Sequence, residues 1–266
     1  MIRIGLVVAL TAADVAVCAW LAPGSLPAWL LGSHVAAKLL ASAGAWLAFS
    51  VLQPSDYMRR VWGPLGLTYF LLVLAEDPVA GAAAGGNARA ALLLAAGALV
   101  VANAMSVCAS SVLAFTFRKA GLESAVSWRP LAAYAAAAVG AAALVWTNVR
   151  GDVGAALDGG GPPAWASAFS YVCDALTFVL LVPVVRFTLR LGQSKLAAPW
   201  WAFAASGLCW LLFSTVEKLP FLGDSRLLPE GLRTAATLLA GLAGLFQLAL
   251  VLEARARLQA DQARAA

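Results

Sequence analysis

Four ionisable side chains stand inside long apolar stretches of the sequence, where their types and positions could do chemistry. They are Asp14, His34, Lys38 and Asp174. A charge deep in an apolar helix is costly, so it is normally paired with another group or used to bind a ligand or move a proton. These four side chains are therefore the first candidates for a functional site.

Asp14 and Lys38 are the best matched of the four. Each lies about ten residues into its apolar stretch, and a rise of ~1.5 Å per residue places both ~15 Å deep. A short connection joins the two stretches, which predicts antiparallel neighbours and a buried Asp14–Lys38 ion pair. His34 precedes Lys38 by four residues and therefore shares its helix face.

Asp174 belongs to a stripe of polar side chains at helical spacing. Ser167, Ser170 and Thr177 lie on the same predicted helix face. Two further segments carry such stripes, namely Asn103, Ser106 and Ser110, and Ser206, Trp210, Ser214 and Glu217. Pro183 follows Asp174 in its segment and could kink that helix.

Two interpretations of these polar groups stay open. In the first, Asp14 and Lys38 fix helix packing and the other groups hydrogen-bond between helices. In the second, Asp14, His34, Lys38 and Asp174 line a polar cavity that binds a small-molecule ligand or relays protons. The candidate site residues are then Asp14, His34, Lys38, Asn103, Asp174 and Trp210.

Motifs for catalysis, metal binding and cofactor binding are absent from the sequence. It contains no HExxH, GxSxG or P-loop pattern, and His34 is its only histidine. Asp14 and Asp174 could in principle act as an acid–base pair, so an enzyme stays open as the least favoured class. The cysteines form no CxxC pair, which predicts free buried thiols, no metal and no cofactor, at Cys18, Cys108, Cys173 and Cys209.

The composition predicts that membrane-spanning helices carry these residues. Of the 266 residues, 62% are hydrophobic and 12% charged, whereas about a quarter of the residues in a soluble domain are charged. The shortest apolar segment is the third, so seven spans are the alternative to eight. The eight segments suited to a ~30 Å hydrocarbon core are about 4–22, 28–52, 61–76, 89–117, 130–148, 164–189, 197–216 and 234–252.

The basic residues predict the orientation of this bundle. If eight helices alternate from a cytoplasmic N-terminus, twelve of the eighteen Lys and Arg residues flank cytoplasmic ends, five flank external ends, and Lys38 lies within a helix. That bias follows the positive-inside rule and predicts two cytoplasmic termini in a cell inner (plasma) membrane. Because the cations flank the apolar segments, we expect lipid rather than nucleic acid as the partner of the net charge of +5.

Small residues and the last residues complete the predicted architecture. The Ala-rich segment 130–148, and Gly241 with Gly244, predict close helix packing. Residues 253–266 are rich in helix formers, and Glu253 with Arg257 makes an i,i+4 pair. We therefore expect a transmembrane bundle over 1–252 and a cytoplasmic helical tail over 253–266.

The second half of the chain carries a resemblance to a known class of protein. Its features are Tyr171, Asp174, Pro183, Arg190, Pro199-Trp200 and Glu217, followed by an apolar helix and a charged helical extension. Over residues 170–266 the chain resembles multi-pass N-terminal sensory modules of bacterial signalling proteins. The resemblance implies a sensor that feeds a kinase or cyclase. This chain ends at Ala266 without such an output domain, so we expect a separate partner protein.

The sequence therefore predicts an all-α polytopic membrane protein, a bundle of eight transmembrane helices. The favoured function is a non-enzymatic sensor or scaffold subunit that acts through a protein partner or as a homo-oligomer. The alternative is a small transporter or proton-linked carrier that uses Asp14, Lys38 and Asp174.

Overall fold

The computed structural model describes residues 2–21, 24–119, 128–192, 194–216 and 227–265, and over these ranges the chain is all-helical. Each predicted apolar segment lies within or overlaps one long helix, and the short helix α4 was not predicted. Short π- and 3₁₀-helical turns, η1 (Ala156–Gly160) and η2 (Lys195–Ala197), precede α7 and α8. The helices are α1 (Ile2–Trp20), α2 (Leu26–Val51), α3 (Arg59–Leu74), α4 (Asp77–Ala83), α5 (Ala88–Lys119), α6 (Trp128–Ala155), α7 (Gly161–Leu191), α8 (Ala198–Val216) and α9 (Leu227–Ala265).

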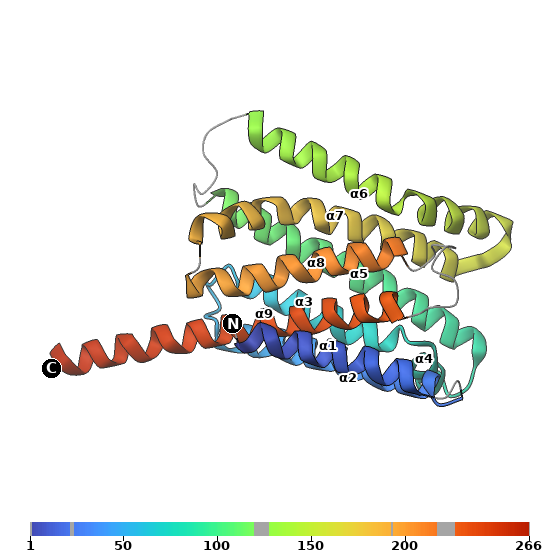
Figure 1. Ribbon diagram of the computed structural model, residues 1–266, viewed down its shortest axis with the longest axis horizontal. Helices are drawn as coiled ribbons and strands as arrows, with labels where there is room; N and C mark the ends of the chain where they lie inside the picture. The colour runs from blue at the N-terminus through green and yellow to red at the C-terminus, as the bar shows by residue number, and fades with distance from the viewer. Residues whose placement is uncertain (1, 22–23, 120–127, 193, 217–226, 266) are drawn as a thin grey trace.

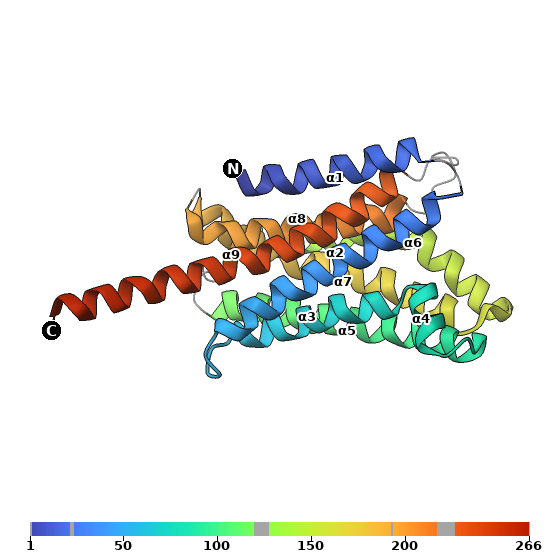
Figure 2. The ribbon, with the colours of Figure 1, turned by 90° about the horizontal axis from the view of Figure 1, so that it is seen from below.

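The long helices run alternately up and down in one bundle (Figures 1 and 2). We call the end at which α2 and α9 begin, and at which α4 lies, the α4 end. The opposite end, where α1 begins and from which the last part of α9 projects, is the termini end. The beginning of α1 and the end of α9 therefore lie toward the same end of the bundle.

Five described runs are long and apolar enough to cross a membrane, and a sixth is the bent pair α3 and α4. One of the five, Ala132–Leu191, contains both α6 and α7. The chain reverses between them near Gly159, whose φ of 96° is open to glycine at little cost. The two helices then lie side by side (Figure 1). The apolar part of α1, Gly5–Trp20, is shorter than these runs.

The α3–α4 pair bends by 84° at its break. Helix α3 has 16 residues and α2 has 26, so α3 is ~15 Å shorter at ~1.5 Å per residue. Because the two helices lie side by side, α3 ends well before α2 begins at the α4 end. The residues at the bend, Ala75 and Glu76, are thereby brought beside the middle of α2.

The termini end is filled by an apolar core rich in aromatic rings. Phe117 stacks on Phe187 with ring centroids 4.5 Å apart, and it meets Trp200 edge-on at 5.2 Å. Trp62 lies 6.4 Å from Trp200 and is almost fully buried. Such aromatic pairs stabilise by ~0.5–1.5 kcal/mol beyond their buried area.

Helices α2 and α9 cross at glycines, as the small residues of α9 predict. A Cβ added at Gly44 would lie 2.5 Å from the carbonyl oxygen of Gly241, and one added at Gly241 would lie 3.1 Å from Cα of Ala41. Only glycine lets the two backbones come this close. Helix α6 packs on α7 along one face, where its Ala141 and Val145 form a buried cluster with Tyr171 and Leu211, while most of its other residues are exposed.

Two further expectations have mixed outcomes. All four cysteines are free thiols, as predicted, but only Cys18 and Cys173 are buried, whereas Cys209 is half-buried and Cys108 is exposed. Helix α9 continues without a break into the expected helical tail, where Arg257 Nη2 lies 2.6 Å from Glu253 Oε1. Glu217 falls outside the described residues.

Candidate functional site

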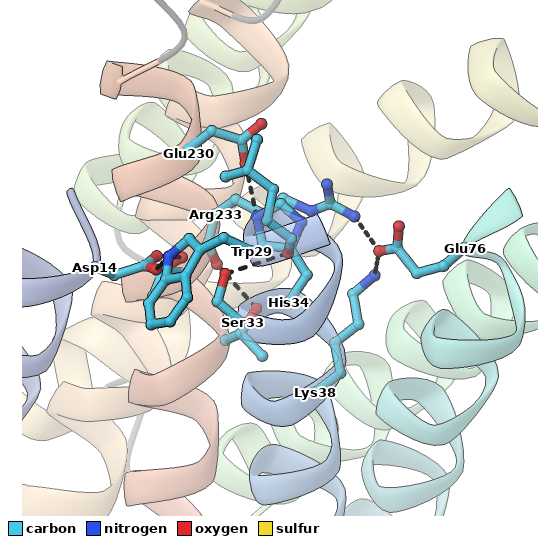
Figure 3. A network of polar contacts seen from close by, with 11 residues as sticks. Asp14, Trp29, Ser33, His34, Lys38, Glu76, Glu230 and Arg233 are labelled. Carbon is cyan, nitrogen blue, oxygen red and sulfur yellow. Dashed lines mark hydrogen bonds and ion pairs between the residues drawn. The ribbon is translucent and has the colours of Figure 1, made fainter. Parts of the chain in front are cut away.

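The predicted ion pair between Asp14 and Lys38 is wrong, because each side chain has other partners (Figure 3). The Asp14 carboxylate accepts hydrogen bonds from Trp29 Nε1 at 3.0 Å and from Thr234 Oγ1 at 2.8 Å. The physical reason is the placement of α1, which packs mainly on α9 and has few contacts with α2. A short connection places two helices in sequence, but it does not make them packing neighbours.

Lys38 instead forms an ion pair with Glu76 at the α3–α4 bend. Its ammonium also donates to the Leu72 carbonyl oxygen at 2.9 Å. The backbone N–H of Glu76 bonds to Val73 rather than to Leu72, so the end of α3 leaves this carbonyl to another donor. Lys38 therefore caps the C-terminal end of α3 and also pairs with the Glu76 carboxylate. The negative end of the α3 dipole favours the ammonium at this position.

Arg233 of α9 shares the Glu76 carboxylate with Lys38. One carboxylate thus holds two cations from two helices, which leaves the group of three with a formal charge of +1. Lys38 is only 3% exposed, so this arrangement takes charge out of water and depends on all three members. Figure 3 shows the cations meeting Glu76 from opposite sides.

His34 lies one turn from Lys38 and faces α9. Its Nε2 is 2.7 Å from Glu230 Oε2, which forms an ion pair when the imidazole is protonated. Glu230 and Arg233 share a face of α9, so the first turns of this helix are bound to α2 through His34 and to the α3–α4 bend through Glu76. We call Asp14, His34, Lys38, Glu76, Glu230 and Arg233 the polar cluster.

A cavity of about 260 Å³ lies beside this cluster. Lys38, Glu76 and Arg233 form part of its wall. The polar stripes of three predicted helices form much of the rest, since Asn103 and Ser106 of α5, Ser167, Ser170, Asp174 and Thr177 of α7, and Ser206, Trp210 and Ser214 of α8 all line it.

Asp174 is tied to the neighbouring helices through Ser214. Ser214 Oγ donates to Asp174 Oδ2 at 2.5 Å, and the Ser214 carbonyl accepts from Asn148 of α6. Trp210 lines the cavity one turn earlier on α8, with its ring edge-on to Phe213 at 5.6 Å. Helix α7 continues as a helix through Pro183.

The six sequence candidates therefore divide into two groups. Lys38, Asn103, Asp174 and Trp210 line one cavity, whereas Asp14 and His34 are buried in the polar cluster outside its wall. Ser110 is buried but does not reach the cavity.

Sequence reasoning missed Glu76, Glu230 and Arg233. Glu76 is the last residue of the shortest of the eight predicted segments. A helix that short ends inside the bundle, at the depth of Lys38, so the length of the segment could have indicated the position of the Glu76 carboxylate. Glu230 and Arg233 precede the apolar segment 234–252, so the sequence suggests that they belong to an external loop. The structure places them inside the helix, in contact with buried partners.

The arrangement suits the binding of a small polar molecule. The described residues hold no group of three or more His, Cys, Asp or Glu side chains placed to bind a metal ion. Charged, amide, hydroxyl and aromatic groups converge on one cavity inside an apolar bundle, which is the usual composition of a small-molecule site.

No protein-family model, curated protein or solved structure matches this chain.

Proposed function

We propose that this chain is a bacterial inner-membrane sensor subunit that binds a small molecule in its cavity and passes the signal to a partner protein through α9. The observation that carries the proposal is the continuity of α9. It is one helix of 39 residues, ~58 Å long, which starts at the polar cluster, includes the cavity residue Arg233 and ends in the tail.

The membrane arrangement in this proposal has eight spans. The bent α3–α4 pair counts as one, the α6–α7 hairpin as two, and α1 as a short span. The termini end faces the cytoplasm, because α3 begins with Arg59 and Arg60 there and the tail carries Arg255, Arg257 and Arg264. At ~58 Å, α9 is longer than the ~30 Å hydrocarbon core, so its last turns stand in water.

Contacts at the base of the tail support a role in signalling. Lys195, between α7 and α8, lies 3.2 Å from Glu253, and Arg255 donates to the Val51 carbonyl at the end of α2. The tail therefore leaves the bundle between two exposed polar contacts that cost little to break. A shift of α9 at Arg233 is thus able to change how the tail is held.

The proposal is tested by filling the cavity without any ligand. Ser170→Trp puts a large ring into the cavity, and Val172→Trp puts the same ring on the exposed face of the same helix. We expect amide hydrogen exchange of residues 253–265, measured in nanodiscs, to change in the Ser170→Trp protein and to stay at the wild-type level in the Val172→Trp protein. Equal exchange in all three proteins would contradict the coupling.

The alternative is a small transporter or proton-linked carrier. One observation favours it: four charged side chains from four parts of the fold, Lys38, Glu76, Asp174 and Arg233, border one cavity inside the bundle. A carrier predicts ligand-dependent or pH-dependent flux in proteoliposomes, which Asp174→Asn abolishes while the thermal unfolding curve is kept. A sensor predicts no flux in either protein.

A further inference from the structure

A second hollow in the protein is an open groove between α5 and α7, with a volume of about 890 Å³. We call it the α5–α7 groove, and it shares no described residue with the cavity. Its described residues are glycines, a proline and apolar or aromatic side chains. Leu93 and Val101 of α5 and Trp165 and Phe169 of α7 are exposed there, on the outside of the bundle. Exposed apolar surface of this kind marks a contact with lipid or with another protein.

The depth of the groove in the membrane follows from helix geometry. The apolar run Ala88–Phe117 has 30 residues and is ~45 Å long, so it exceeds a ~30 Å hydrocarbon core by ~8 Å at each end when it is centred. Leu93 then lies at the boundary of the hydrocarbon, and Val101 lies ~12 Å deeper. The groove therefore faces the acyl chains of one leaflet, the leaflet at the α4 end.

The groove closes before it reaches the other leaflet. Leu113 of α5 and Val184 of α7 lie farther toward the termini end, where both belong to the buried apolar core. A groove ~12 Å long covers less than half of the hydrocarbon, whereas a partner helix crosses all ~30 Å of it. An acyl chain stays within its own leaflet, so the length of the groove favours a lipid as its occupant.

A cation lies at the outer mouth of the groove. Arg89 is exposed in the first turn of α5 and precedes the groove residues Leu93, Ala96 and Val100 by four, seven and eleven positions. This spacing places Arg89 on the face of α5 that lines the groove, one turn closer to the headgroups than Leu93. Within the part of the chain that the structure describes, no carboxylate pairs with Arg89.

We propose that the α5–α7 groove binds an anionic phospholipid of the leaflet at the α4 end, with an acyl chain along residues 93–101 and the phosphate on Arg89. The guanidinium suits a phosphate because it donates two parallel hydrogen bonds to it. Trp165 lies near the start of α7, at the boundary between headgroups and hydrocarbon, where an amphipathic ring is favoured. Because the groove and the cavity share no described residue, this lipid site is independent of the proposed sensor function.

The experiment measures lipid binding to the full chain in detergent by native mass spectrometry. Phosphatidylglycerol and phosphatidylcholine with the same acyl chains are titrated separately, and the dissociation constant of the first bound lipid is obtained for each. Both lipids carry a phosphate, but phosphatidylcholine also carries a compensating cation. We expect phosphatidylglycerol to bind about fivefold more tightly, which is the effect of one arginine near an anionic lipid surface.

The headgroup contact is tested at Arg89. Arg89→Gln removes the cation, so the preference for phosphatidylglycerol should disappear while phosphatidylcholine binds as before. Arg150→Gln is the matched control, because Arg150 is an exposed cation of α6 near the same end of the bundle and does not line the groove. It should keep the wild-type preference.

The acyl-chain contact is tested by filling the groove. Gly97→Phe adds a ring at a groove residue whose Cβ position has no atom within 4 Å, so both lipids should bind at least fivefold more weakly. Gly140→Phe adds the same ring on the exposed surface of α6, again with no atom within 4 Å, and should bind both lipids as the wild type does. All four substituted positions are exposed, so no variant removes a buried contact.

Three results would overturn the proposal. They are equal affinities for the two lipids in the wild-type protein, the same preference in the Arg89→Gln and Arg150→Gln proteins, and the same affinities in the Gly97→Phe and Gly140→Phe proteins. A dimer or a co-purified protein chain that Gly97→Phe alone removes would assign the groove to a protein surface and would also overturn it.

Discussion

The two ends of the bundle are held together by different kinds of contact. The termini end is held by aromatic rings and by the glycine crossing of α2 and α9. The α4 end is held by the polar cluster and encloses a cavity beside it. Shape complementarity dominates at the first end and charge compensation at the second.

The difference teaches where this protein can change state. A close-packed apolar region tolerates little displacement, because each shift loses contacts or creates overlap. A carboxylate shared by two cations has an alternative arrangement whenever a ligand supplies another anion. Helix α9 belongs to both regions, so a change at Arg233 can be carried past the fixed crossing at Gly241 to the tail.

The largest effect is expected from breaking the charge compensation at the α4 end. Glu76→Gln leaves Lys38 and Arg233 without their shared carboxylate, and an uncompensated buried charge costs about 3–5 kcal/mol. Glu253→Gln makes the same change between Lys195 and Arg257, which are 78% and 74% exposed, where a pair contributes about 0–1 kcal/mol. Thermal unfolding in detergent measures both, and similar losses would show that Glu76 does not compensate the two cations as described.

The next effect tests the termini end. Gly44→Ala places a Cβ against the Gly241 backbone, and we expect a loss of about 1–3 kcal/mol from overpacking. Gly97→Ala adds the same methyl group where no atom lies within 4 Å, and helix propensity predicts a gain of about 0.5–1 kcal/mol. If both variants unfold at the same temperature, the close crossing is absent.

A smaller effect tests the corrected partner of Asp14. Asp14→Asn keeps one oxygen as the acceptor for Trp29, and its amide NH2 donates to the Thr234 hydroxyl in place of accepting from it. Both contacts lose their charge, so we expect a cost of about 1 kcal/mol. In the double variant with Lys38→Met, the two costs should add within about 0.5 kcal/mol. If the double variant were more stable than either single variant, the result would support the direct Asp14–Lys38 ion pair that the sequence predicts.

The smallest effect concerns the base of the tail. Hydrogen bonds from Lys195 and Arg257 lower the pKa of the Glu253 carboxyl from its usual range. A lowered folded pKa means that the contact is fully present above the ordinary glutamate pKa and is lost as the pH falls through the lowered value. We expect tail exchange to rise only below the ordinary glutamate pKa in the wild-type protein, and to be raised at every pH in Glu253→Gln, which has no carboxylate.

Much of the helix pattern was predictable from residue types alone. Apolar runs and turn residues located each long helix, and the polar stripes of α5, α7 and α8 indicated faces that meet at one cavity. These features are local, since they depend on helical spacing within one segment. The alternation of the helices then placed the beginning of α1 and the end of α9 at one end.

The charge partners were not predictable in the same way. Depth along a helix suggested Asp14 for Lys38, but pairing depends on which helices are neighbours, and α1 lies on α9. The true partner, Glu76, reaches Lys38 only because α3 ends early and bends by 84°. Arg233 completes the cluster although it lies 157 positions after Glu76 in the sequence, a separation that no local pattern reports.

We propose above that a change in the contents of the cavity reaches α9 through the contacts of Arg233. It is tested most directly by hydrogen exchange of residues 253–265 in the Ser170→Trp protein, with and without Arg233→Gln. Arg150→Gln serves as the control for removing a guanidinium, because Arg150 is exposed on α6 and does not line the cavity. We predict that the cavity-filling ring changes tail exchange in the presence of Arg233 and has no effect in its absence. An equal response with and without Arg233 would contradict the account.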